Sequence, residues 1–592
     1  MSLIHPARRA PPLLFGEMTV AGRFLKRQAA LLLVVFLSLL TFLAQYALRG
    51  LDDNRLTSWR WCFQDGTAAT VFSWIAVGAL LAYCLAVAAV RLRHRAVALF
   101  LLAFGMTCLF WREPEVILDA SRYFTQAKHL EVYGIRYFLE EWGRGIEAWT
   151  DMPLVPFLYG LIFRAFGESR IVIQAFTSLL FALTCVLTYR VGCELWDEDT
   201  GFYGGAFLLG MPYLYSQTPL MLVDVASAFF LLFAVLTFLR ALKRGGLSVL
   251  CAGAAIFLAF YSKYSTWPML SVCAIAAFVF VLVEAGRERK KVILRTLLAA
   301  AISASLIGAV FLYKFGVFSD QIRLLIGYQK PGLGRWGESF TSTFLFQMHP
   351  FITLLALFSA VAALRKKDPR YVIVAWLVVL LVALQIRRSR YSIPVFPMLA
   401  LSASYGLCRL RDARVRRCIV ACVVTSSLAV AFFAYLPFLR GLSAVNIQRA
   451  GAFLNGLKGR DVEVFSLASA DPVVDPSVNV PLLDIFTHKR ILYDYRGGLP
   501  QKERERIAGS SLRFTVEYRN PKYYLPPPQQ GKDPAVAVLS DTAMDVLPGY
   551  VSKRLEGYRQ VKVFDGDEGI FRYRTCVRVF ERVVSEAEGR AR

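Results

Sequence analysis

The chain has 592 residues, of which 56% are hydrophobic and only 19% are charged. This composition excludes an ordinary soluble protein and indicates many membrane-spanning helices. The net charge of +25 would suit nucleic-acid binding in a soluble protein. Here most basic residues lie in short loops between apolar runs, where they orient a membrane protein, so we expect no nucleic-acid partner.

About thirteen apolar runs are long enough to cross the hydrocarbon core of a membrane. The first run is long enough to remain as an anchor, and no small-residue cleavage site of a secretory signal accompanies it. In chain order the runs are residues 28–48, 71–90, 95–111, 171–189, 201–216, 219–240, 247–261, 267–284, 292–313, 343–364, 371–386, 391–410 and 418–439.

The loop charges predict the orientation of these spans. Basic clusters precede the first span and follow the second, sixth, eighth, tenth and twelfth spans. They all fall on one side if the N-terminus is cytoplasmic, as the excess of Lys and Arg in cytoplasmic loops requires. An odd number of spans then places the C-terminus outside the membrane. We expect a multi-pass protein of a prokaryotic plasma (inner) membrane.

Four regions follow from this pattern. Residues 1–110 hold the first three helices, 111–170 form a first outer loop, 171–440 form the main membrane core, and 441–592 form a soluble outer domain. The last region alternates helical and strand-like patterns, which predicts a small α/β domain. We expect helices at 447–457 and 551–558 and strands at 461–467, 536–540, 559–564 and 571–580.

Two acids stand at the outer edge of the predicted membrane. Asp119 follows the third span, and Asp224 lies near the outer end of the sixth. Carboxylates beside hydrocarbon are costly, which makes them candidates for function. Asp119 has a simpler interpretation as a solvated loop acid or as the N-cap of a helix at 120–130. Two carboxylates on one side can divide the work, one as general base and the other in positioning or in binding a metal.

Basic residues on the outer side are a second signal, because the orientation bias disfavours them there. Lys263 ends the seventh span, and Arg387, Arg388 and Arg390 lie between the eleventh and twelfth spans. Arginine pairs bidentately with phosphate, although snorkelling toward lipid headgroups is an alternative. For Arg387 and Arg388 we weigh snorkelling and phosphate binding equally. For Lys263 and Arg390 we favour phosphate binding.

Together these residues predict a site for a lipid phosphate, a sugar and an acceptor. We name Asp119 and Asp224 as the catalytic acids. In the first turn after Asp119, Arg122 and Tyr123 could orient it or a phosphate. The predicted donor-binding residues are Arg122, Tyr123, Lys263, Arg387, Arg390 and Tyr391. The histidines and cysteines show no metal-binding spacing, so a cofactor is not indicated and a divalent metal stays open.

Four motifs resemble those of GT-C fold glycosyltransferases of the protein O-mannosyltransferase and lipid A aminoarabinose transferase type (glycosyltransferase family 39). They are residues 119–123 (Asp-Ala-Ser-Arg-Tyr), 151–159 (Asp-Met-Pro-Leu-Val-Pro-Phe-Leu-Tyr) with 166–169 (Phe-Gly-Glu-Ser), 222–226 (Leu-Val-Asp-Val-Ala) and 387–397 (Arg-Arg-Ser-Arg-Tyr-Ser-Ile-Pro-Val-Phe-Pro). The similarity runs from about residue 111 to residue 410.

This resemblance implies a polyprenyl-phosphate-linked sugar as donor and inversion at the anomeric carbon. It implies that Asp119 is the base or its close partner, and that Lys263, Arg387 and Arg390 bind phosphate. The relatives also carry a soluble outer C-terminal domain, and their metal dependence varies.

The sequence departs from that family in three places. Ala120 stands where the mannosyltransferases have a second acid. Asp151 stands where the aminoarabinose transferases have a lysine that contacts the lipid phosphate, which argues against aminoarabinose as the sugar. Two spans precede the family's usual first helix, and the sequence gives no role for them.

We therefore expect a membrane glycosyltransferase that acts on the outer face, with a protein, a glycolipid or a polysaccharide as acceptor. Two alternatives remain: a surface-polysaccharide polymerase or ligase, and a lipid or sugar transporter. A transporter would carry its acids and helix breaks at mid-membrane and show repeats. The charges here lie at the outer ends, which favours the enzyme.

Overall fold

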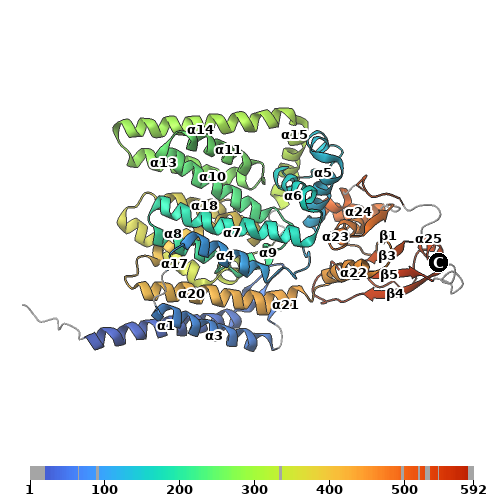
Figure 1. The fold of residues 1–592 in the computed structure, drawn as a ribbon, viewed down its shortest axis with the longest axis horizontal. Helices are drawn as coiled ribbons and strands as arrows, with labels where there is room; N and C mark the ends of the chain where they lie inside the picture. The colour runs from blue at the N-terminus through green and yellow to red at the C-terminus, as the bar shows by residue number, and fades with distance from the viewer. Residues whose placement is uncertain are drawn as a thin grey trace, which may run out of the picture.

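The computed structural model describes residues 20–63, 66–88, 92–332, 337–494, 499–517, 521–526, 534–544 and 546–583. Long helices run side by side in a bundle, and a mixed domain of strands and short helices caps one end (Figure 1). We call this end of the bundle the domain end.

The two N-terminal helices lie together along one side of the bundle. Helices α1 (Val20–Ala47) and α3 (Thr67–Ala88) pack against each other and against α20 (Ala413–Val430) (Figure 1). A 3₁₀ turn, η1 (Arg49–Leu51), and the short helix α2 (Trp59–Cys62) lie in the connection between them. The loop between the helices therefore lies at the domain end.

The bundle itself is built around α10 (Asp224–Arg244), which is buried along nearly its whole length. The other helices of its first part are α4 (Arg95–Cys108), α7 (Arg170–Leu195), α8 (Glu198–Leu208), α9 (Pro212–Gln217), α11 (Leu247–Phe260), α12 (Thr266–Met269), α13 (Ser271–Val283) and α14 (Gly286–Tyr313). The later ones are η4 (Ser342–Phe346), α17 (Pro350–Lys366), α18 (Tyr371–Ala383), η5 (Ser389–Val395), α19 (Phe396–Leu407), α20, η6 (Ala431–Tyr435) and α21 (Leu436–Leu439).

Every predicted span coincides with one of these helices or with consecutive ones. Seven helical stretches in the described residues are long and apolar enough to cross a membrane by themselves. They are Gln28–Ala47, Thr67–Ala88, Arg170–Leu195, Asp224–Arg244, Thr266–Val283, Gly286–Tyr313 and Ala413–Leu439. The predicted polytopic α-helical fold class is confirmed, whereas the number of thirteen crossings stays a prediction.

Two predicted spans differ in detail from the helices observed. The run at 201–216 is divided into α8 and α9, with Pro212 in the first turn of α9, a position that proline favours. The run at 219–240 becomes helical only at Asp224. The non-helical segment before α10 places that acid at the first turn of a buried helix.

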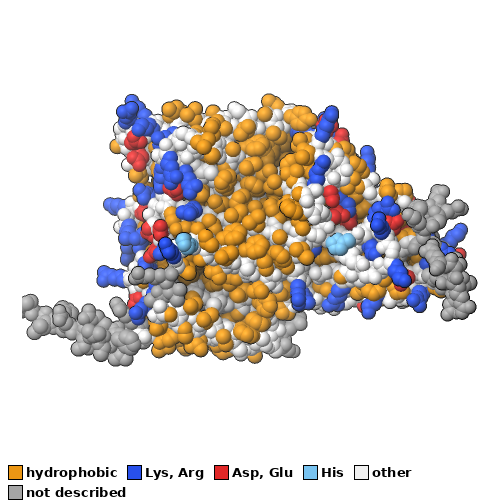
Figure 2. All heavy atoms as spheres, in the orientation of Figure 1, with side chains coloured by type: hydrophobic (Ala, Val, Ile, Leu, Met, Phe, Trp, Pro, Cys, Tyr) orange, Lys and Arg blue, Asp and Glu red, His pale blue; other side chains and the backbone are white. Residues whose placement is uncertain are grey.

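Figure 2 shows an apolar belt around the middle of the bundle, with charged side chains gathered toward its two ends. Many leucines of α1, α3 and α14 are exposed, Leu80 and Leu297 among them. Exposed apolar surface on this scale fits contact with lipid rather than with water.

Several shorter helices cover the domain end. They are α5 (Asp119–Glu141), α6 (Leu154–Phe166), α15 (Phe315–Leu324), η2 (Leu325–Gln329) and α16 (Lys330–Gly332). Helix α5 is kinked at Gly134, which has a positive φ of 89° that glycine adopts without steric cost. Helix α6 packs against α5 (Figure 1).

The C-terminal domain contains a five-stranded sheet with strand order β2-β1-β3-β5-β4. β1 is parallel to β2 and β3, and β5 is antiparallel to β3 and β4. Its elements are α22 (Ala444–Gly456), β1 (Asp461–Ser466), η7 (Pro476–Val478), α23 (Asn479–Asp484), β2 (Arg490–Tyr493), α24 (Gln501–Ala508), η8 (Arg513–Glu517), β3 (Ala535–Ser540), α25 (Gly549–Arg554), β4 (Tyr558–Phe564) and β5 (Cys576–Arg582).

The predicted small α/β domain is confirmed, and most of its predicted elements have an observed counterpart. The strand expected at 571–580 begins only at Cys576, because the segment before it contacts the bundle, where the Phe571 ring packs against Phe438 of α21. The helix expected at 551–558 ends at Arg554, and β4 already begins at Tyr558. Strand β2 was not expected, since its apolar core is only three residues long.

The domain is fastened to the first loop of the bundle. Lys128 of α5 lies 2.7 Å from Asp484 of the domain and 2.8 Å from Glu168 at the end of the loop. Tyr524 donates a hydrogen bond to the same Asp484 carboxylate at 2.8 Å. Burial and the neighbouring charges of Asp484 and Glu131 raise the pKa of Glu168, against the opposing effect of Lys128. These contacts hold the domain over the end of the bundle.

Candidate active site

The first acid of the site, Asp119, is the first residue of α5. It does not act as a helix cap, because Leu118 precedes the helix and makes no side-chain cap. Its carboxylate accepts ion pairs from two arginines instead: Arg122 at 3.1 Å and Arg390 at 2.6 Å. The side chain is 18% exposed, so it is enclosed but still reachable from a cavity.

The second acid, Asp224, is held by the segment that precedes α10. The Tyr159 hydroxyl donates to the Leu222 carbonyl at 3.0 Å, and the Met221 amide donates to Glu115 at 2.8 Å. Glu115 is itself buried and paired with Arg170. These bonds replace the helical hydrogen bonds that the segment lacks, as buried backbone requires. The start of α10 is therefore fixed in place.

The two predicted acids are joined through one arginine. Arg390 lies 3.0 Å from Asp224 through Nε and reaches Asp119 through Nη2. Asp224 also pairs with Lys263. The Asp224 side chain is only 1% exposed and that of Arg390 4% exposed. Residues that lie far apart in the sequence thus form one buried chain of alternating charge.

A third acid extends this chain at its other end. Asp151, between α5 and α6, lies 3.2 Å from Arg122 and accepts a hydrogen bond from Gln126 at 3.0 Å. The full order of the ion chain is Asp151, Arg122, Asp119, Arg390, Asp224 and Lys263. Within the described residues, the buried Arg390 Nη1 and Arg122 Nε have no hydrogen-bond partner.

The charges of the ion chain set the protonation of Asp119 and Asp151. Burial acts to raise the pKa of Asp119, but Arg390, Arg122 and Arg388 outweigh it and hold that pKa well below its usual value. Burial and the charge of Asp119 raise the pKa of Asp151 to about 6, although Arg122 and Gln126 oppose them. Asp119 is therefore ionised at neutral pH, and Asp151 titrates close to it.

A cavity of 1420 Å³ lies over this ion chain. Asp119, Arg122, Asp151, Lys263 and Arg390 line it. It also extends beneath the C-terminal domain, which contributes the stretches 442–444, 511–514 and 568–573. Asp224 is not among the lining residues and lies behind Arg390 and Lys263. Of the two predicted catalytic acids, only Asp119 faces the cavity.

Aromatic rings support the cations of the site. Lys263 lies 4.8 Å from the Tyr391 ring centroid. Arg122 lies over two rings, Tyr123 at 5.4 Å and Phe514 of the C-terminal domain at 4.5 Å. Such contacts attract each cation to the face of the ring.

Arg387 has a different environment from the other predicted phosphate ligands. It lines the cavity but is exposed, and it donates to Gln385 at 2.9 and 3.2 Å. Its neighbour Arg388 also lines the cavity and reaches the Tyr391 hydroxyl at 3.2 Å. Every predicted site residue except Asp224 therefore reaches the cavity wall, and Arg387 alone lies outside the cluster of ion pairs and rings.

A metal site in the described residues would need clustered His, Cys, Asp or Glu side chains. No group of three or more His, Cys, Asp or Glu side chains there could hold a metal ion. The three acids of the ion chain are each neutralised by Arg or Lys instead.

Three contributors to the site were not among the residues named from the sequence. Asp151 stood out only as a departure from a family motif, although an acid in an apolar, proline-rich stretch is a usable signal. Glu338 is buried at the cavity and accepts the Ser389 amide at 2.7 Å. Phe514 lies in a tail of ordinary composition, where nothing in the sequence marks it.

Comparisons with known proteins bear on the family and the fold. Residues 150–313 match the family model of dolichyl-phosphate-mannose-protein mannosyltransferases. The matched segment includes Asp151, Asp224 and Lys263. No curated protein sequence matches the chain.

Solved structures match over most of the chain. The crystal structure of ArnT from Cupriavidus metallidurans bound to undecaprenyl phosphate has a TM-score of 0.51 at 12% identity, over 82% of this chain and 96% of that one. This chain has the GT-C fold. An Archaeoglobus fulgidus oligosaccharyltransferase, AglB, solved with an inhibitory peptide and a dolichol-phosphate, has a TM-score of 0.40 at 11% identity, over 75% and 69% of the two chains. The protein is thus a multi-pass membrane protein with the fold of GT-C glycosyltransferases.

Proposed function

We propose that this protein transfers a sugar from a polyprenyl-phosphate donor to an acceptor hydroxyl at the outer face of the membrane. The observation that carries the proposal is the ion chain beneath the cavity. It places an ionised carboxylate, Asp119, beside a cluster of cations at the edge of an apolar bundle. An acid next to a phosphate-binding cluster is what transfer from a lipid phosphate requires.

The donor phosphate is bound by the cations around Tyr391. Lys263, Arg388 and Arg390 lie around this ring, and Arg387 adds a further charge at the cavity wall. Arginine offers phosphate a planar pair of donors. These residues neutralise the charge that develops on the leaving phosphate.

The lipid tail leaves the cavity across its apolar margin. Ile326 and Leu384 are exposed and line the same cavity, together with Pro268 and Leu325. An apolar margin beside a phosphate cluster lets the tail remain in hydrocarbon while the headgroup reaches the site. The acceptor approaches from the aqueous side, beneath the C-terminal domain.

Asp119 serves as the base, and Asp224 as the residue that positions the cations. When the donor phosphate binds Arg390, it competes with Asp119 for that arginine. Loss of the pair raises the pKa of Asp119 toward its usual value and makes it a better base. Asp119 takes the acceptor proton, the acceptor oxygen bonds to the anomeric carbon, and the bond from that carbon to the phosphate oxygen breaks with inversion.

The orientation follows from the loop charges. Arg95, Lys243 and Arg416 belong to the basic clusters that the sequence pattern assigns to one side of the membrane, and they pair with Asp199 and Glu194. We propose that the loops with this net excess of basic residues lie in the cytoplasm, as the positive-inside bias favours. The N-terminus is then cytoplasmic, and the C-terminal domain lies outside the plasma (inner) membrane.

Turnover of a donor panel by the purified protein tests the proposal. Radiolabelled polyprenyl-phosphate sugars are offered with host glycolipids, polysaccharides and proteins as acceptors, to wild type, Asp119→Asn and Asp224→Asn. Asp320→Asn is a matched control, because Asp320 is an exposed acid at the same end of the bundle. We expect transfer by wild type and the control, and none by Asp119→Asn.

Two outcomes would support the alternative functions. Use of lipid-diphosphate donors in place of lipid-phosphate donors would indicate a polysaccharide polymerase or ligase. Movement of the intact lipid-linked sugar across vesicles, without transfer, would indicate a transporter. Unchanged turnover in Asp119→Asn would remove this acid from the chemistry.

A further inference from the structure

The loop between the two N-terminal helices reaches the cavity. The cavity is lined by Asp53, Asn54, Arg55 and Leu56 of this loop, together with the first-loop acids Asp119 and Asp151. These helices precede the first helix expected from the family, and the transfer chemistry proposed above does not use them. Their loop nevertheless contributes to the same enclosed space.

Hydrogen bonds within the chain give this loop a defined shape. The buried Asp52 carboxylate accepts from the amides of Asn54 at 3.1 Å and Trp59 at 2.8 Å. Asn54 in turn accepts from the amides of Leu56 at 2.9 Å and Thr57 at 2.8 Å. The loop therefore has a defined surface in which the amides of Asn54, Leu56, Thr57 and Trp59 are already occupied.

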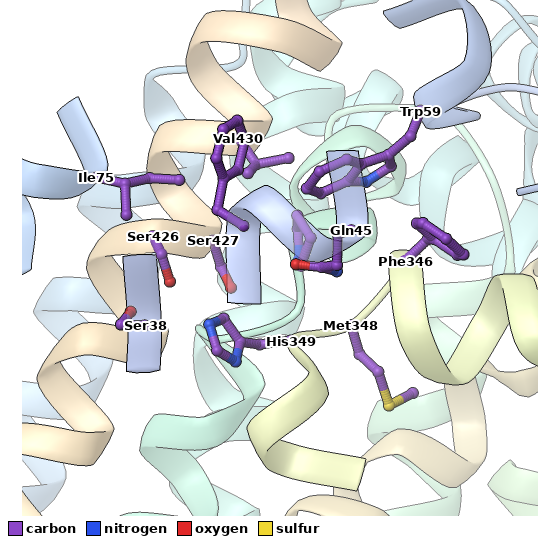
Figure 3. Close-up of a pocket in the computed structure, with 12 residues that line it drawn as sticks. Ser38, Gln45, Trp59, Ile75, Phe346, Met348, His349, Ser426, Ser427 and Val430 are labelled. Atoms are coloured by element: carbon purple, nitrogen blue, oxygen red, sulfur yellow. The ribbon is translucent and has the colours of Figure 1, made fainter. Parts of the chain in front are cut away.

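The loop is also fixed to the bundle behind it. Trp59 donates to the Tyr435 hydroxyl at 3.0 Å, and Thr57 donates to Gln347 at 2.9 Å. Figure 3 shows this joint, where Trp59 and Gln45 lie beside residues of the η4–α17 segment and of α20. The space left there is about 10 Å³, room for no more than one water molecule. Because this contact is tightly packed, the bundle holds the loop in a fixed position.

Two contacts place the loop between the cations around Tyr391 and the C-terminal domain. Asp53 accepts from the Ser339 amide at 2.9 Å and hydroxyl at 3.0 Å. The adjacent Glu338 holds the amide of Ser389, next to Arg390. On the other side, Trp61 packs edge-on against Phe571 of the domain, with ring centroids 5.8 Å apart.

We propose that residues 53–56 and the domain segment 568–573 form the acceptor wall, a surface that binds a glycan acceptor. This inference rests on the proposed transfer reaction and names the acceptor class for the same site. The acceptor wall contains carboxylates, guanidinium groups and two aromatic rings, and the hydroxyl of one ring, Tyr573, already donates to Asn479. Carboxylates and guanidinium groups bind sugar hydroxyls, and an aromatic ring packs on an apolar sugar face. These side chains are Asp53, Arg55, Glu568, Phe571, Arg572 and Tyr573.

Two features favour a glycan over a peptide or a second phosphate. A peptide acceptor bound in extended form needs free backbone donors on the protein, and the amides at positions 54, 56, 57 and 59 of this loop are occupied. A phosphate would need an excess of positive charge, whereas this wall contains two acids, Asp53 and Glu568, and two arginines, Arg55 and Arg572. Mixed donors and acceptors without excess charge suit hydroxyl groups.

Steady-state kinetics with two wall variants test this inference. Leu56→Trp fills the wall, and Asp53→Asn removes a charge with little change in shape. Leu80→Trp is the control, because Leu80 lies exposed on α3. The probes are a polyprenyl-phosphate sugar as donor, undecaprenyl phosphate for binding, and the glycolipid and peptide fractions of host membranes as acceptors.

We expect the KM for the glycolipid fraction to rise about tenfold or more in both wall variants, the range that loss of one or two pocket contacts produces. The stabilisation by undecaprenyl phosphate in thermal unfolding, and the rates of the control, should stay unchanged. An unchanged acceptor KM in both variants, or transfer to the peptide fraction alone, would overturn the wall and leave the transferase intact. A wild type that neither binds undecaprenyl phosphate nor transfers sugar would overturn both proposals.

Discussion

Removal of Asp224 should mainly lower the stability of the fold, whereas removal of Asp119 should mainly abolish transfer, although both acids belong to one ion chain. Arg390 lies 3.0 Å from Asp224, and two unit charges at that distance attract by about 5 kcal/mol at an effective dielectric constant near 20. Desolvation offsets part of this attraction, and breaking a buried pair costs about 3–5 kcal/mol. Asp224→Asn should therefore destabilise the fold by about 3 kcal/mol.

The difference between the acids lies in what each removal leaves behind. Without Asp119, Arg390 keeps Asp224 and Arg122 keeps Asp151. Without Asp224, Lys263 loses its one ion pair among the described residues. Asp119 is also more exposed than Asp224, 18% against 1%, so Asp119→Asn should cost less stability than Asp224→Asn while it abolishes transfer.

A double-mutant cycle measured by denaturant or thermal unfolding of the detergent-solubilised protein checks this reasoning. Removing both partners should be far less harmful than removing one, so Asp224→Asn with Lys263→Met should regain much of the stability that Asp224→Asn loses. Equal destabilisation by Asp119→Asn and Asp224→Asn would refute the argument. So would a double variant that is less stable than either single one.

Three further outcomes follow from contacts around the site. Tyr159→Phe removes the bond to the Leu222 carbonyl and should cost about 1 kcal/mol in unfolding assays; no change would mean that this bond does not hold the segment before α10. Phe514→Ala should lower turnover through loss of the ring against Arg122, worth about 1–2 kcal/mol, and unchanged kinetics would exclude a role for the domain in the site. The raised pKa of Asp151, about 6, means that the folded protein holds this proton more tightly than the unfolded chain, so the associated stability is present at low pH and lost as pH rises through 6. Relative to wild type, Asp151→Asn should therefore gain up to about 3 kcal/mol between pH 4 and pH 7, and stability profiles that stay parallel across this range would contradict the shift.

Hydrophobic periodicity alone identified much of this fold. A span is recognised from a local property, the length of an apolar run, and the runs of this chain each fall on observed helices. The same local reasoning found β1, β3 and β4 of the C-terminal domain. It missed β2, whose four residues become a strand only through pairing with β1.

The sequence also marked the charged residues of the site, because acids and outer-side cations beside hydrocarbon are costly wherever they occur. Asp119, Asp224, Lys263 and Arg390 were named on this ground, whereas Arg122 was named for its place in the first turn after Asp119. Their catalytic and binding roles stay predictions. The sequence shows that charged residues lie beside apolar runs, where they are costly, but it does not show which residues they pair with.

Only the tertiary structure decided which of these residues meet, and which acid faces the cavity. Asp224 and Asp119 look alike in the sequence, yet packing buries one behind Arg390 and leaves the other open. Packing also brought Phe514 and the loop at 53–56 to the site from regions with no signal of function. The physical reason is that apolar periodicity fixes which residues form helices, whereas the meeting of side chains from distant segments depends on how those helices and the domain pack.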